Sequence, residues 1–129
     1  EEKANESRNV YKLAMRGKID LRAPTFLFFE VLNILIKKKK SEKHKVTLFI
    51  DELLNSNIKF EVENVEIAQE VKHIMFKYQI TAYDALYLLL AKEKDCKLLT
   101  LDEELLRLKN LTISLADFND QMKESPKFD

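Results

Sequence analysis

The chain has 129 residues with one Gly, one Cys and no Trp, and 22 basic side chains balance 22 acidic ones. This length favours one domain, and a single Cys excludes a disulfide framework or a Cys-based zinc site and is typical of a reducing cytoplasm. A single Gly excludes the phosphate loops of P-loop and Rossmann dinucleotide enzymes, which need several glycines. The zero net charge gives no overall attraction to nucleic acid, and no apolar run reaches the roughly 20 residues of a membrane helix.

The predicted elements alternate between helices and short strands along the chain. The pattern predicts a helix over 4–16 ending at Gly17, an extended segment over 19–23 and an apolar helix over 26–38. The later elements follow in this order: a helix capped by Ser41, a strand over 58–62, a helix over 64–78 capped by Asn64, a helix over 81–94, a buried strand over 97–101, a helical turn over 103–109 and a strand over 111–115. This alternation predicts an α/β layered fold with a mainly parallel sheet, formed by residues 1–120 and followed by a polar tail over 121–129.

Three carboxylates occupy positions where a purely structural role is uncomfortable. Glu30 interrupts a helix that is apolar on nearly every face, where a polar stripe facing water is the simpler interpretation. Asp84 opens the helix that starts near Thr81, so it could equally serve as part of a capping box. Asp102 follows the expected buried strand, at the sheet edge where α/β proteins bind ligands, but it could also be a helix N-cap. Each acid alone leaves both interpretations open.

Taken together, the three acids indicate a metal site. Two of them lie in the first half-turns of helices that we expect to be buried or at the carboxyl edge of a strand. Each could therefore project to the same end of the sheet. Clustered carboxylates repel one another unless a divalent cation neutralises them, and oxygen ligands suit Mg²⁺ or Mn²⁺. Such an ion can activate a water molecule and offset charge on a phosphate. Because the sequence offers no Ser/His/Asp arrangement, metal-assisted hydrolysis is the most natural chemistry.

Three segments resemble the ordered acidic motifs of PIN-domain ribonucleases, especially toxins of the VapC type. They are Phe-Glu-Val-Leu-Asn-Ile-Leu from Phe29, Ile-Thr-Ala-Tyr-Asp-Ala-Leu-Tyr from Ile80, and Leu-Leu-Thr-Leu-Asp-Glu from Leu98. The resemblance implies a Rossmann-like three-layer fold, Mg²⁺ or Mn²⁺, hydrolysis of RNA phosphodiester bonds, homodimers, a cognate antitoxin and a cytoplasmic location. By that resemblance Glu30, Asp84 and Asp102 would be catalytic acids that bind the metal, and Thr100 would orient an acid or a water molecule.

The sequence departs from this family at its start. Family members usually begin with a strand that ends in an Asp, a central metal ligand. Here the chain begins in what reads as the first helix, and Asp20 follows that helix, so we expect this first strand and its Asp to be missing from the sequence.

The one dense basic cluster surrounds Lys37, Lys38, Lys39 and Lys40, with Lys43, His44 and Lys45 close behind. It could contact RNA phosphates, although a solvated helix end is the simpler interpretation. Three functional hypotheses therefore stand: a metal-dependent endoribonuclease of a VapBC-type toxin–antitoxin pair, a non-catalytic PIN-like RNA- or protein-binding module, and a plain α/β scaffold whose acids only cap helices.

Overall fold

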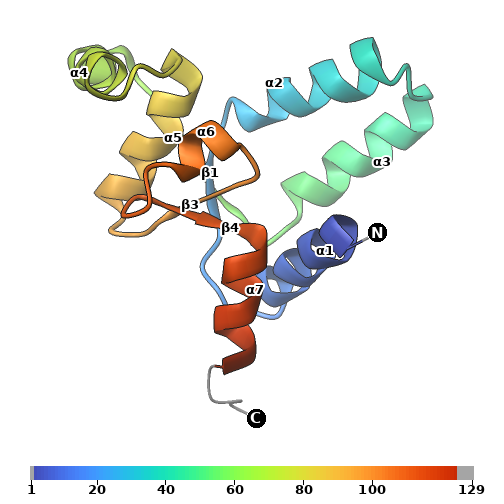
Figure 1. Cartoon of the computed structure of the whole chain (residues 1–129). Helices are drawn as coiled ribbons and strands as arrows, with labels where there is room; N and C mark the ends of the chain where they lie inside the picture. The colour runs from blue at the N-terminus through green and yellow to red at the C-terminus, as the bar shows by residue number, and fades with distance from the viewer. Residues whose placement is uncertain (1, 125–129) are drawn as a thin grey trace.

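Helices form most of the part of the chain that the computed structural model describes, which is residues 2–124. Their order and arrangement are shown in Figure 1. The α-helices are α1 (Glu2–Met15), α2 (Leu27–Leu32), α3 (Lys43–Leu54), α4 (Ala68–Tyr78), α5 (Ala82–Glu93), α6 (Glu103–Leu106) and α7 (Leu115–Glu124). A π-helix, η1 (Asn33–Lys38), continues α2, and a 3₁₀ turn, η2 (Val65–Ile67), leads into α4.

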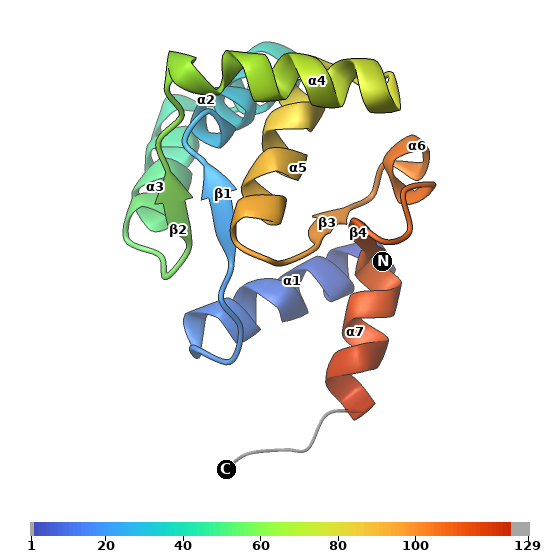
Figure 2. The ribbon, with the colours of Figure 1, turned by 90° about the vertical axis from the view of Figure 1, so that its left-hand side faces the viewer.

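Short strands pair in parallel and form two separate sheets. They are β1 (Arg22–Pro24), β2 (Lys59–Glu61), β3 (Leu98–Thr100) and β4 (Thr112–Ser114). β1 pairs with β2, and β3 pairs with β4. Figure 2 shows the two pairs as separate units of the fold. The expected α/β class and parallel pairing are confirmed, whereas the strands of residues 2–124 form two sheets where we expected one.

A cavity of about 400 Å³ lies between the two sheets. Its walls include Leu21, which directly precedes β1, and Arg22 on β1. Leu98 and Leu99 on β3 and Val10 on α1 also line it. Helix α5 contacts both β1 and β3, so it connects the two halves of the fold. We expected β3 to be buried, but it is only half-buried, because Leu98 and Leu99 line this cavity.

The main core lies between α4 and α5. Val71, Ala85 and Leu89 are buried there, and apolar side chains from both helices and from the turn between them pack around these three residues. Helix α1 packs against α7, with Val10 and Ala14 buried. These contacts follow the spacing of apolar residues along each helix, which places one stripe toward a neighbour.

The segment formed by α2, η1 and α3 is far less buried than its sequence suggests. No residue of α2 or η1 is buried, and Phe29 is 67% exposed. Glu30 is exposed, which agrees with the simpler interpretation of a polar stripe facing water, whereas the expected burial of its helix was wrong. Apolar residues on nearly every face do not ensure burial when few other elements pack against a helix. The π-helical turn is visible in the bond from the Lys39 N–H to the Ile34 carbonyl oxygen at 2.9 Å.

Local signals located most helix ends. Gly17 ends α1 with φ of 69°, a left-handed conformation that favours glycine, and the Asn64 side chain caps η2. The Ser41 cap was wrong, because Glu42 precedes α3 and offers no side-chain hydrogen bond. Helix α7 continues to Glu124, past the expected domain end at residue 120, and residues 125–129 lie outside the described part. Within that part no helix is both long and apolar enough to span a membrane.

Candidate acidic site

The first predicted acid, Glu30, lies beside a tyrosine of another helix. The hydroxyl of Tyr87 donates a hydrogen bond of 2.9 Å to Glu30 Oε1, joining residues 57 positions apart. Glu30 lies on α2, whereas Tyr87 lies on α5, three residues after Asp84. Because residues three apart share one face of a helix, this contact brings Glu30 to the face of α5 that carries Asp84.

An aromatic cluster holds Tyr87 in place. The Phe26 ring, directly before α2, meets the Tyr87 ring edge-on with centroids 5.1 Å apart. The same Phe26 ring meets Tyr83 at 5.5 Å. Such edge contacts fix ring orientation and favour the observed rotamers. The tyrosines therefore pack against the residue that precedes α2.

The surroundings of the Tyr87 hydroxyl are negative. Burial raises the pKa of Tyr87 far above its ordinary value, and the hydrogen bond to Glu30 raises it further. The charges of Glu30, Glu63 and Asp84 act in the same direction. The phenol is therefore protonated at neutral pH and serves as a hydrogen-bond donor. We call Glu30, Glu63, Asp84 and Tyr87 the tyrosine-centred group.

Glu63 is the member of this group that sequence reasoning missed. Glu63 Oε2 accepts a 2.7 Å hydrogen bond from the Thr25 hydroxyl, and its Oε1 accepts the Phe26 N–H at 3.4 Å. Glu63 thus accepts hydrogen bonds from the side chain of Thr25 and the backbone N–H of Phe26, the two residues just before α2. Its position two residues after β2, at the carboxyl end of a parallel strand, is the signal that could have identified it.

Asp84 is half-buried in the first turn of α5, and its backbone N–H donates to Thr81 Oγ1 at 3.2 Å. The predicted cap by Thr81 is therefore correct. The cap uses the backbone of Asp84 and leaves the side-chain carboxylate available for other contacts. The dipole at the start of a helix also favours a negative charge at this position.

Asp102 and Thr100 lie at the end of β3. Asp102 Oδ1 accepts the Glu104 N–H at 2.9 Å and caps α6, while the Asp102 N–H donates to Thr100 Oγ1 at 3.0 Å. Asp102 is exposed and Thr100 is half-buried. The capping interpretation of Asp102 is therefore correct, and the Thr100 hydroxyl contacts the backbone of Asp102 and not its carboxylate.

The predicted acids do not come together as one metal site. In residues 2–124, no group of three or more His, Cys, Asp and Glu side chains is arranged to hold a metal ion. Glu30 accepts a hydrogen bond from Tyr87, and Asp84 lies three residues before Tyr87 on α5, whereas the contacts of Asp102 are with Thr100 and Glu104. Carboxylate oxygens are ligands that Mg²⁺ or Mn²⁺ prefers, but the described residues alone do not meet the three-ligand arrangement that we expected.

The basic cluster Lys37–Lys40 lies at the end of the helical segment that carries Glu30. Lys37 and Lys38 occupy the last turn of η1, and Lys40 adopts a left-handed backbone conformation with φ of 49°. All four lysines are exposed. A chain of positive charge therefore begins two helical turns beyond Glu30, and it is accessible to a long anionic ligand.

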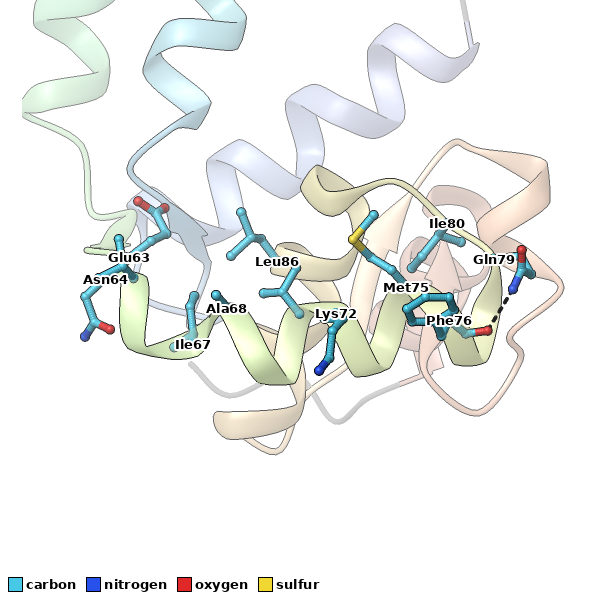
Figure 3. Close-up of a pocket in the computed structure, with 12 residues that line it drawn as sticks. Glu63, Asn64, Ile67, Ala68, Lys72, Met75, Phe76, Gln79, Ile80 and Leu86 are labelled. Atoms are coloured by element: carbon cyan, nitrogen blue, oxygen red, sulfur yellow. Dashed lines mark hydrogen bonds between the residues drawn. The ribbon is translucent and has the colours of Figure 1, made fainter.

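A larger groove of about 840 Å³ runs along α4. Figure 3 shows that apolar side chains such as Ile67, Met75 and Phe76 line it, with Glu63 near one end. Apart from Glu63, the groove contains none of the acids discussed above. This groove is thus separate from Glu30, Asp84 and Asp102.

The comparisons with known proteins identify one family. The model of the PIN domain matches residues 2–111, which include every predicted acid. Neither the curated proteins nor the solved structures gave a match. PIN domains are generally nucleases with an α/β fold, and the parallel strands and surrounding helices of this chain agree with that fold. The match spans most of the sequence and the fold agrees with it, so this chain belongs to the PIN-domain family.

Proposed function

We propose that this protein is a Mg²⁺- or Mn²⁺-dependent endoribonuclease that hydrolyses RNA phosphodiester bonds. The observation that carries the proposal is the hydrogen bond between Glu30 and Tyr87, which brings Glu30 to the face of α5 that bears Asp84. These two acids belong to separate motifs of a family whose members are generally nucleases. The family match and this contact together support a shared acidic site.

Charge explains why a cation belongs to this proposal. The carboxylates around Tyr87 would repel an RNA phosphate, which is itself negative. A divalent cation bound by carboxylates would offset both charges and supply an activated water molecule. Glu30, Asp84 and Asp102 are the proposed ligands. Because the described carboxylates form no three-ligand group, the family supports the metal requirement more strongly than their present arrangement does.

The remaining residues have roles in binding and orientation. Lys37–Lys40 would contact RNA phosphates, which gives salt-dependent affinity. Thr100 would hold Asp102 through the backbone bond already described. From the resemblance to VapC-type proteins we further propose a toxin of the cytoplasm that forms a homodimer and is neutralised by a cognate antitoxin. Growth arrest on expression, relieved by co-expression of a candidate antitoxin, tests this role.

A cleavage assay tests the proposed activity. The chain is incubated with structured and unstructured RNAs in Mg²⁺, in Mn²⁺ and in excess EDTA, and the products are resolved on a denaturing gel. We expect discrete internal cleavage with either metal and none with EDTA. Cleavage that persists equally in EDTA would contradict metal dependence, and intact RNA in every condition would contradict the nuclease proposal.

A non-catalytic RNA- or protein-binding module is the second candidate. It is favoured by one observation, the lack of a three-ligand acidic group among residues 2–124. Such a module would bind RNA or protein without cutting RNA. Retarded but intact RNA in a gel-shift experiment with Mn²⁺ present would favour this candidate over the nuclease.

A further inference from the structure

Tyr87 occupies a position from which it can control the geometry of Glu30. Its ring lies edge-on to Phe26, and its hydroxyl points at Glu30 Oε1 from 2.9 Å. The side chain is half-buried, so its orientation is restricted by packing.

Glu30 depends on such a contact because its own helix provides little restraint. No residue of α2 or η1 is buried, and Glu30 is exposed. The start of α2 is held by Glu63, through Thr25 and Phe26. Farther along this helix, the bond from Tyr87 is the contact that fixes the carboxylate itself. An exposed Glu side chain without it would sample several rotamers.

We propose that Tyr87 is a positioning residue of the acidic site, which holds the Glu30 carboxylate at the face of α5 that bears Asp84. This inference rests on the proposed nuclease function for its catalytic consequence. Tyr83 provides a matched comparison within the same helix. Its ring also packs against Phe26, but it is 62% exposed and the hydrogen bond to Glu30 comes from Tyr87.

Steady-state RNA cleavage by Tyr87→Phe and Tyr83→Phe tests the proposal. Tyr87→Phe removes the donor and keeps the ring, so we expect kcat to fall roughly 10-fold with an unchanged KM for RNA, as for other residues that orient a site carboxylate. Tyr83→Phe should leave both constants unchanged. A general loosening of α2 and η1 would instead raise KM, because the same helical segment carries Lys37–Lys40.

A second measurement needs no cleavage. In protein with ¹³C-labelled tyrosine, the ring-carbon resonance next to the hydroxyl of Tyr87 should shift at neutral pH in Glu30→Gln, whereas that of Tyr83 should not. Unchanged resonances of Tyr87 would show that the contact does not exist in solution and would overturn the proposal. If this resonance shifts but the protein has no nuclease activity, the contact between Tyr87 and Glu30 is supported and only the proposed function is refuted. Unchanged kcat in active Tyr87→Phe would overturn the positioning role.

Discussion

Asp102 shows at the scale of one residue how a structural role and a functional role can coincide. Its carboxylate caps α6 through the Glu104 N–H, so the chain needs an acceptor at this position whatever the protein does. Asn replaces Asp well as an N-cap, whereas Ala does not. The two substitutions therefore separate capping from chemistry.

We predict that Asp102→Ala lowers the free energy of unfolding by about 1 kcal/mol and that Asp102→Asn changes it far less. Both variants should lose RNA cleavage, because neither supplies a carboxylate to a metal ion. Urea unfolding followed by circular dichroism measures the first effect, and the cleavage assay measures the second. Full cleavage by Asp102→Asn would mean that Asp102 serves only as a cap.

At the scale of elements, the helical segment α2–η1 connects an acidic site to a basic end. The Glu30 carboxylate lies near its start and Lys37–Lys40 lie at and just beyond its end. This order suits a chain-like anion that passes from the lysines toward the acids. The lysines are exposed, so their contribution should be electrostatic and sensitive to salt.

Replacing Lys37–Lys40 by Gln should weaken RNA binding and its salt dependence together. If all four contact single-stranded RNA phosphates, the slope of log K against log salt becomes less negative by up to about 3. Fluorescence anisotropy with labelled RNA measures this slope. Replacing Lys72 and Lys77 of α4 by Gln controls for the loss of positive charge, and an equal effect per lysine in both variants would exclude a specific contact at the basic cluster.

The sequence predicted elements better than it predicted their surroundings. Gly17, Asn64 and Thr81 mark helix ends through local hydrogen bonds and backbone conformation, which neighbouring residues determine. Burial of the helix around Glu30 depends on which elements pack against it, and an apolar pattern does not contain that information. The π-helical turn at η1 was missed because its residues also fit an ordinary helix.

The candidate site was predictable only in part for the same reason. Family-like motifs pointed to Glu30 and Asp84, and the Tyr87 hydrogen bond brings Glu30 to the helix that carries Asp84. Glu63 belongs to no such motif and approaches through the pairing of β2 with β1, a contact between distant segments. Where Asp102 lies relative to the others depends on how the β3–β4 sheet is held against the β1–β2 sheet, which local sequence does not determine.

At the scale of the whole molecule, the separation of the two sheets is the main departure from our expectation. The β1–β2 and β3–β4 pairs are each two strands wide, and two-stranded sheets are marginal on their own. The cavity of about 400 Å³ lies between β1 and β3. The Leu21 carbonyl oxygen accepts a hydrogen bond from β2, and the Leu98 N–H donates one to the residue just before β4. Successive residues of a strand direct their backbone groups to opposite sides. The backbone groups of Arg22 and Leu99 therefore point away from these partners and toward the cavity.

We predict that a short Val- and Ile-rich strand fused ahead of Glu1 through a flexible linker fills this cavity. Hydrogen exchange, followed by NMR, should then slow at the amides of Arg22 and Leu99 because they gain partners. The thiol of Cys96, which is exposed and lines the cavity, should react more slowly with a disulfide reagent. The same fusion with Pro in the middle of the strand is the control, and equal exchange in both fusions would refute the prediction.

We propose above that Glu30 and Asp84 belong to one acidic site that hydrolyses RNA with a divalent metal. Asp84→Asn tests it most directly, because the Thr81 cap uses the backbone of Asp84 and should survive the substitution. Glu93→Gln, at the other end of α5, is the matched control. We predict that Asp84→Asn abolishes Mn²⁺-dependent RNA cleavage with little change in melting temperature, while Glu93→Gln cleaves normally. Undiminished cleavage by a folded Asp84→Asn protein would contradict it.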